Sequence, residues 1–367
     1  MMYFGLFTIL ILILSVSAIS TKKQQGKDFS GKKSASSLLV LGGIVGTIVG
    51  GSSTVGTSQA AFSVGLSGWW YTLGCSIGIL LFAFFFSKKI YNSGKTTLLE
   101  IVASRYGKRC SVTMSLLSAG GTTLSIVSQV LSGVALITSL LHFNQTTALL
   151  LFIFLVLIYV FFGGGISLGY MGILKAILMA IGFLACGAVA YYSIGSSINT
   201  LPKEPYFNIF AGGVWKNLSQ VISLSFGIIT GQNYTSALIT GKTYKESKRA
   251  IILSSILGPF IGLFCIFVGF YMKLNHPEIE SSVALPQFIL LKMPPFIAGC
   301  LEGMLLLTLV GTTAGTLYAN STICYRGLLK DKVKNETLAT RILILIFTFI
   351  VSIIVLSNQG NYSVALD

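Results

Sequence analysis

The residue types that most often carry chemistry are sparse in this 367-residue chain. His142 and His276 lie far apart, and neither belongs to an HExxH motif or a Cys/His cluster, so metal catalysis and a catalytic triad both lack their parts. The six cysteines fall mostly within apolar stretches and are most simply packing residues. The sequence therefore predicts no enzyme.

Backbone and hydroxyl oxygens are better candidates for a binding site than the histidines and cysteines. The first group lies in residues 42–62, GGIVGTIVGGSSTVGTSQAAF. Gly42, Gly46 and Gly50 are spaced four apart, which lets two helix backbones approach closely. The next residues, GSSTVG, form helix poorly because glycine and hydroxyl side chains both weaken it. We expect either an interrupted helix whose free carbonyls face a polar cavity, or a continuous close-packed helix.

A second group of oxygens lies in LVGTTAGT near the end of the chain. Thr312, Thr313 and Thr316 present hydroxyls on adjacent faces of one predicted helix, and Gly311 and Gly315 allow a neighbour to approach. These hydroxyls either serve a ligand or bond back to carbonyls of their own helix.

Composition sets the broad class. With 53% hydrophobic residues, 10% charged residues and a mean hydropathy of +0.84, the chain is predicted to be an all-α, polytopic membrane protein whose partner is the lipid bilayer. Its net charge of +15 does not indicate nucleic acid, because the basic residues sort by loop.

About ten segments are long and apolar enough to span. They cover approximately residues 2–20, 37–62, 69–86, 113–141, 147–162, 168–193, 214–233, 250–272, 296–325 and 340–357. An N-terminus outside places most of the 25 Lys and Arg residues in cytoplasmic loops, including 21–36, 88–112, 234–249 and 326–339. This predicts a multi-pass protein of the plasma membrane with an uncleaved N-terminal anchor.

Several motifs resemble the sodium:solute symporter family, in that family's order and over essentially the whole chain. They are GGIVGTIVGGSSTVGTSQAAFSVGLSGWWYTLG, SGKTTLLEIVASRYGKR, GGGISLGYMGILKAILMAIG, SFGIITGQNYTSALITGKTYKESKRA and LTLVGTTAGTLYANSTICYRGLLKD. The resemblance implies the leucine-transporter type of fold, two inverted repeats of five helices.

On this pattern, residues 1–36 form the anchor helix and a basic cytoplasmic loop, and 37–193 form the first inverted repeat. An extracellular loop covers 194–213, and 214–367 form the second repeat, truncated after its fourth helix. The chain is then a fragment of a longer transporter, or a shortened member whose missing helix is supplied by a partner or dispensed with.

The resemblance also implies sites. Na⁺ would bind the carbonyls of Ser52, Val55 and Leu309 and the hydroxyls of Thr312 and Thr313, since a hard cation takes oxygen ligands. A small polar organic solute would bind beside the break. The implied solute-facing residues are Gln59, Ser225 and Gln232, although each amide could instead bond a neighbouring helix.

This chain departs from the family pattern in YMGILK. Gly172 and Lys175 stand where relatives carry an acid and a glutamine, and Gly315 replaces an aspartate. An ammonium at Lys175 could stand in for Na⁺, with Glu302 as its partner; alternatively Lys175 snorkels to the cytoplasmic face.

The expected function is sodium-coupled import of a small polar organic solute by alternating access. The alternatives are a proton-coupled or ion-independent transporter that uses Lys175, and a non-transporting sensor or truncated family member. The sequence leaves the solute and the oligomeric state open.

Overall fold

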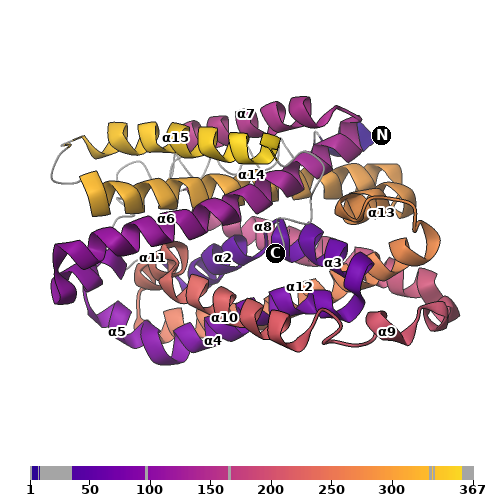
Figure 1. The fold of residues 1–367 in the computed structure, drawn as a ribbon, viewed down its shortest axis with the longest axis horizontal. Helices are drawn as coiled ribbons and strands as arrows, with labels where there is room; N and C mark the ends of the chain where they lie inside the picture. Colours follow the sequence, from indigo (N-terminus) through magenta and orange to yellow (C-terminus); the bar gives the residue numbers. More distant parts are fainter. Residues whose placement is uncertain are drawn as a thin grey trace.

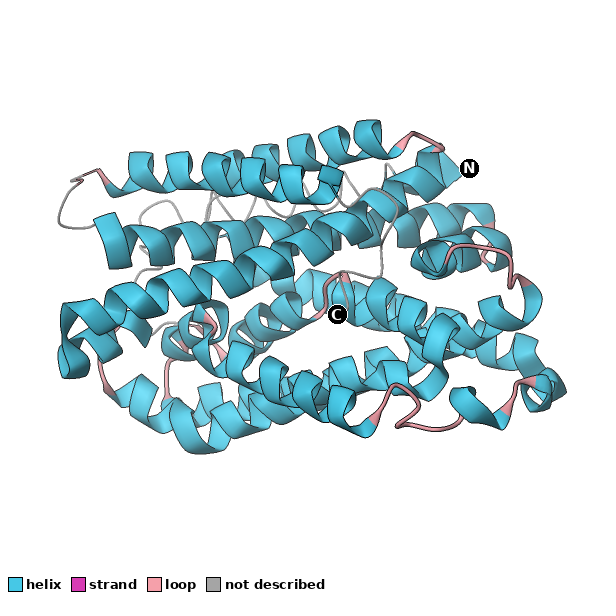
Figure 2. Ribbon diagram, in the orientation of Figure 1, coloured by secondary structure: helices cyan, strands magenta, loops and turns pink. Residues whose placement is uncertain are grey.

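The computed structural model describes residues 2–6, 8, 35–95, 98–163, 167–329, 333 and 335–357, with the backbone alone for residues 99 and 162–172. Within these ranges the fold is almost entirely helical, and the one β-bridge joins Ala35 to Gly241 (Figure 2). The expected all-α fold is confirmed. Most of the predicted anchor, the basic loop 21–34 and the end of the chain from residue 358 lie outside the described residues.

The elements of the first half follow in chain order. They are α2 (Ser37–Ile48), η1 (Ser52–Gly56), α3 (Thr57–Val64), η2 (Gly65–Trp69), α4 (Trp70–Leu81), η3 (Phe82–Phe86), α5 (Ser87–Asn92), α6 (Leu98–Leu141), α7 (Gln145–Gly163) and α8 (Ser167–Ile194). The second half contains η4 (Gly195–Thr200), α9 (Lys203–Tyr206), α10 (Val214–Thr230), α11 (Gln232–Thr240), α12 (Tyr244–Asn275), η5 (Ser281–Val283), α13 (Ala284–Lys292), α14 (Pro295–Cys324), η6 (Tyr325–Leu329) and α15 (Glu336–Ser357).

Six helical segments in the described part of the chain are long and apolar enough to cross a membrane. They cover Ser52–Asn92, Glu100–Leu141, Ile173–Thr200, Tyr244–Asn275, Pro295–Leu329 and Glu336–Ser357. Two shorter apolar helices, Ser37–Ile48 and Gln145–Phe161, accompany them. The expected multi-pass membrane architecture is confirmed at this level.

The helices run roughly side by side and bury two separate hydrophobic cores (Figure 1). The first core joins α6, α7, α14 and α15 with α3, α8 and the later part of α12. The second core joins α2, α4, α5, α10 and α11 with the start of α12. Helix α12 and helix α2 contribute residues to both cores, so the two cores adjoin within one bundle.

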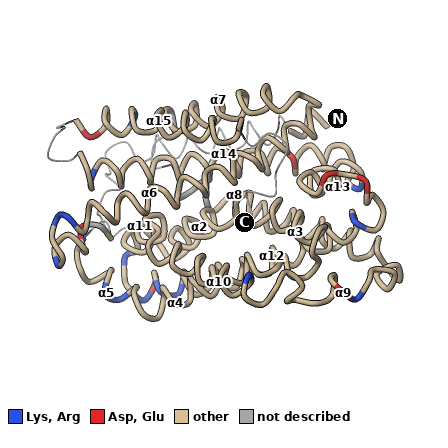
Figure 3. Tube along the Cα trace, in the orientation of Figure 1, with Lys and Arg blue, Asp and Glu red and all other residues tan. Residues whose placement is uncertain are grey.

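Lys and Arg residues gather at the end of the molecule formed by α5 and the start of α6 (Figure 3). We call this the basic end. Sequence pattern alone predicted a loop over 88–112, yet α6 begins at Leu98 and continues through Gly107, whose φ of +82° marks a kink. Glycine is the residue that adopts such a φ without strain, so a short helical arm, 98–106, precedes the long helix.

One predicted span proved to be two helices. Residues 214–233 were expected to form a single span followed by a loop, but α10 ends at Thr230 and α11 begins at Gln232. Gly231 between them is extended, with φ −67° and ψ 121°. A side chain there would lie 2.8 Å from the Tyr234 ring and 2.9 Å from the Gly227 carbonyl oxygen, so glycine permits the break.

Candidate solute and cation site

The first break interrupts the glycine-rich helix just after α2. Regular helix ends at Ile48, residues 49–51 are irregular, and η1 resumes at Ser52 with wider π-type turns. The Ser53 hydroxyl accepts from the Gly50 N–H at 3.0 Å and donates to the Ile48 carbonyl at 2.7 Å. A side chain thus replaces the lost backbone partners, as buried polar groups require. Of the two alternatives that the sequence left open, the structure contains the interrupted helix, and the interruption begins slightly before GSSTVG.

The small face of α2 is used for close packing, as its spacing indicated. Gly42 lies directly against Ile173 of α8. A Cβ at Gly50 would lie 3.5 Å from Thr312 of α14. At Gly51 it would lie 2.7 Å from both the Leu309 side chain and the Ser132 hydroxyl. The absence of side chains therefore lets the break touch α14 and α6.

The threonines of α14 are buried beside this break. Thr312 Oγ1 donates to the Thr308 carbonyl at 2.7 Å, and Thr313 Oγ1 donates to the Leu309 carbonyl at 2.7 Å. Thr316 bonds back to Thr312 in the same way at 2.8 Å. All three hydroxyls therefore bond back to carbonyls of their own helix, and each oxygen keeps lone pairs of the kind that a hard cation takes as ligands.

The other predicted cation ligands lie within η1 and α14. Ser52 opens η1, and its carbonyl accepts from the Thr57 hydroxyl at 3.3 Å. Val55 is buried in the same turn, and Leu309 is fully buried next to Gly51. The approach between the two segments runs through Gly50 and Gly51, which lie against Thr312 and Leu309 of α14.

Lys175 reaches into the same region from α8. Its Nζ donates to the Gly46 carbonyl at 2.8 Å and lies 3.3 Å from the Thr308 carbonyl. Both acceptors belong to the helices that the break brings together. These two bonds hold the ammonium against the backbone of α2 and α14.

Glu302 is the second ionisable group inside the bundle. Its side chain is fully buried in α14, and neither carboxylate oxygen has a hydrogen-bond partner in the described part of the chain. Glu302 and Thr308 are separated by about 9 Å along the helix at 1.5 Å per residue. Lys175 bonds to carbonyls near Thr308 rather than to this acid, so the suggested ion pair is not formed.

The second break positions one predicted solute residue. Gln232 is the first residue of α11, directly after Gly231, and its amide donates to Ser236 at 2.9 Å. Ser225 lies in α10, buried against Gly78 of α4, and its hydroxyl has no partner among the described residues. Gln59 lies on α3 and is partly exposed. Gln59, Ser225 and Gln232 therefore lie on three different helices, and no hydrogen bond joins any two of them among the contacts described above.

Helix α2, which precedes the first break, and helix α11, which follows the second break, are joined to each other at their ends. The Ala35 N–H donates to the Thr240 carbonyl at 2.8 Å, and the Lys242 N–H donates to the Ala35 carbonyl at 3.0 Å. The Tyr91 hydroxyl donates to the Gly241 carbonyl at 2.9 Å. The start of α2 and the end of α11 are thus joined directly, and both helices pack in the second core.

Sequence reasoning missed the contribution of α6. Ser128 Oγ lies 2.8 Å from Ser52 Oγ, and Ser132 lies against Gly51. The sequence did contain a pattern that indicates this contribution, because Ser128 and Ser132 are four residues apart and so lie on one face of an apolar helix.

Two interrupted helices in a bundle of apolar helices, with oxygen-rich breaks, define a membrane transport protein rather than an enzyme. The chain belongs to the sodium:solute symporter family, whose model matches residues 29–364.

Among known proteins, the uncharacterized symporter YwcA of Bacillus subtilis is 27% identical over 240 residues, which are 62% of this chain and 47% of that protein. The match thus spans about half the length of this curated relative.

Two solved structures show a similar fold. A Na⁺-coupled sialic acid symporter, in its substrate-bound outward-open state, matches with a TM-score of 0.80 and 16% identity, covering 99% of this chain and 82% of that one. A manganese transporter of Eremococcus coleocola matches with a TM-score of 0.55 and 12% identity, covering 90% and 74%.

Proposed function

We propose that this chain imports a small polar organic solute by sodium-coupled alternating access. The observation that carries the proposal is the contact between the first break and α14, where Gly50 and Gly51 meet Thr312 and Leu309. Interrupted helices at membrane depth are the sites at which transporters of this architecture hold solutes and coupling ions. The Na⁺-coupled structural relative supports the choice of ion.

In this proposal the two interrupted helices occupy equivalent positions in two inverted repeats of the leucine-transporter type, 37–193 and 214–367. Two observations support that symmetry: each repeat contains one break, and hydrogen bonds join the start of α2 to the end of α11. The basic end is the cytoplasmic end, since Lys and Arg concentrate there (Figure 3). The protein lies in the plasma membrane with its N-terminus outside.

The cation would be held by Thr312, Thr313 and Leu309 from α14 together with carbonyls of the first break. The solute would lie beside both breaks, within reach of Gln59 or Gln232. Alternating access then requires the group of helices that contains α2 and α11 to rock against the group that contains α6 and α14.

A second candidate mechanism follows from the Lys175 contacts. An ammonium that donates to Gly46 and Thr308 carbonyls already supplies a positive charge where the break meets α14. Lys175 would then replace Na⁺, and transport would be proton-coupled or independent of ions.

One experiment separates these mechanisms. The purified chain is reconstituted in liposomes and uptake is measured for a panel of sugars, amino acids, carboxylates and vitamins, with Na⁺ or choline outside and with pH varied. Sodium-dependent uptake supports the first mechanism, and uptake that responds to pH but not to Na⁺ supports the second. Absence of uptake for every solute under all conditions contradicts both.

A further inference from the structure

Glu302 of α14 is an acid that neither mechanism above uses. It belongs to the apolar segment Pro295–Leu329, its side chain is 0% exposed, and neither carboxyl oxygen has a hydrogen-bond partner among the described residues. Buried polar groups are normally bonded, and an ionisable side chain inside a membrane is expensive, so such a residue marks a functional site by default.

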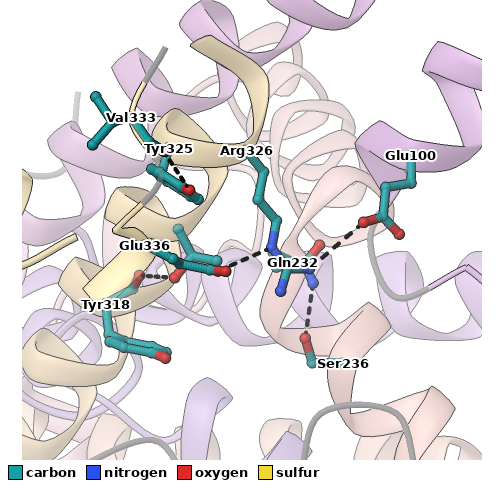
Figure 4. Close-up of polar contacts among 9 residues, drawn as sticks. Glu100, Gln232, Ser236, Tyr318, Tyr325, Arg326, Val333 and Glu336 are labelled. Carbon is teal, nitrogen blue, oxygen red and sulfur yellow. Dashed lines mark hydrogen bonds and ion pairs between the residues drawn. The ribbon is translucent and has the colours of Figure 1, made fainter. Parts of the chain in front are cut away.

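Acids at the basic end show the usual arrangement. Glu100 Oε1 lies 3.7 Å from Arg326 Nη1, and Glu336 Oε1 lies 3.4 Å from Arg326 Nε (Figure 4). Within the described ranges, no Lys, Arg or His pairs with Glu302 in this way. A negative charge on Glu302 would therefore have no counterion beside it.

The packing around Glu302 is apolar. Leu301 and Met304, which flank it on α14, lie against α8, where a Cβ at Gly182 would be 2.6 Å from Leu301 and 3.5 Å from Met304. Several titratable groups on helices that pack against α14 are engaged elsewhere: Lys175 with two carbonyls, Lys292 over the Tyr271 ring, Arg341 over the Phe161 ring, Tyr159 beside Gly311 and Tyr234 in the second core.

Two thiols lead from Glu302 toward the outer side of the first break. Cys186 of α8 lies within electrostatic range of the Glu302 carboxyl, and Cys265 of α12 lies within range of Cys186. The Cys265 carbonyl accepts from the Ser58 hydroxyl at 2.9 Å. Ser58 precedes Gln59 on α3, so buried polar groups connect Glu302 to the segment where the solute is proposed to bind.

Glu302 also shares a face of α14 with the proposed cation ligands. Leu309 and Thr313 follow it by about two and three helical turns, which places all three on one side of the helix. Leu309 lies directly against Gly51 in the first break. A movement that separates the first break from α14 therefore acts on the face that carries Glu302.

We propose that Glu302 is a proton-binding site, neutral as a carboxylic acid in this conformation, and that it releases its proton when the first break and α14 move apart. An ionised carboxylate without a partner carries a large desolvation penalty, which the neutral acid avoids. On release the O–H bond breaks, the proton passes to water, and the carboxylate remains on the protein. The proposal rests on the transport function above and makes uptake respond to pH even where Na⁺ drives it.

The test is infrared spectroscopy of the reconstituted chain at neutral pH, because the C=O stretch of a protonated carboxyl group is distinct from that of a carboxylate. The wild type should show this band, and Glu302→Gln, which keeps the shape of the acid but binds no proton, should lose it. Glu278→Gln is the control and should keep the band, since the Glu278 side chain is 69% exposed. Transfer of the wild type to D₂O should shift the band, because the proton exchanges whenever the acid meets water.

Absence of the band in the wild type overturns the proposal, as does a band that persists in Glu302→Gln. A band that stays unshifted in D₂O rejects proton release. None of these spectra needs a solute, so they remain readable if uptake fails in every assay. Where uptake is measured, Glu302→Gln should lose the pH dependence of the wild type, and an unchanged dependence rejects the site while the transport function stands.

Discussion

Lys175 Nζ lies 2.8 Å from the carbonyl oxygen of Gly46, so a fixed ammonium from α8 meets the helix that leads into the first break. Gly46 can accept this bond because it belongs to the small face of α2, which packs closely on α8. The ammonium also bonds the Thr308 carbonyl, so it lies between α2 and α14, beside the predicted cation site.

Replacing this lysine tests which cation drives transport. If the ammonium substitutes for Na⁺, Lys175→Gln should make uptake sodium-dependent or increase that dependence by about tenfold, since one charge is removed from the site. Uptake is compared in Na⁺ and choline. Lys175→Arg, which keeps the charge, is the control, and unchanged ion dependence in Lys175→Gln would show that the lysine serves structure alone.

The hydroxyls of α14 provide a second test. Thr312→Ala and Thr313→Ala should each raise the Na⁺ concentration for half-maximal uptake by about tenfold, because losing one oxygen ligand costs about 1–1.5 kcal/mol. Thr322→Ala is the matched control, since Thr322 makes the same bond to its own helix, to the Tyr318 carbonyl at 2.9 Å. If all three variants keep the wild-type sodium response, these residues are not the cation site.

The close approach at Gly51 is expected to limit substitution. A Cβ there would lie 2.7 Å from Leu309 Cδ2 and Ser132 Oγ, so Gly51→Ala should lower stability by about 1–3 kcal/mol. Gly227→Ala is the control, because nothing lies within 4 Å and alanine favours helix. Thermal unfolding in detergent measures both. Equal melting temperatures for the two variants would contradict the packing described for the first break.

Solute contact can be separated from packing at two predicted positions. The Ser225 hydroxyl is buried without a partner among the described residues, so Ser225→Ala should leave the melting temperature unchanged or slightly higher. A raised KM in that variant would then report solute contact. Gln59→Ala should raise KM about five- to tenfold if its amide binds solute, since a lost hydrogen bond costs about 1 kcal/mol. Wild-type KM values in both variants would place the solute elsewhere.

Sequence pattern alone predicted the class of this protein, offered an interruption after α2 as one of two alternatives, and singled out the threonines of α14 as candidate ligands. Glycine spacing and hydroxyl runs are local properties that determine whether a helix can continue, so residues 42–56 could be interpreted without neighbours. Hydropathy located most spans for the same reason, because each must bury a length of backbone set by the bilayer.

Only the tertiary structure decided what those residues touch. The break at Gly231 escaped notice because one glycine within an apolar segment is compatible with helix, and its extended conformation depends on packing around Tyr234. The hydrogen-bond partners of Lys175 are the Gly46 and Thr308 carbonyls, which come from distant parts of the chain. Such contacts depend on how helices are arranged, and no local pattern encodes that arrangement.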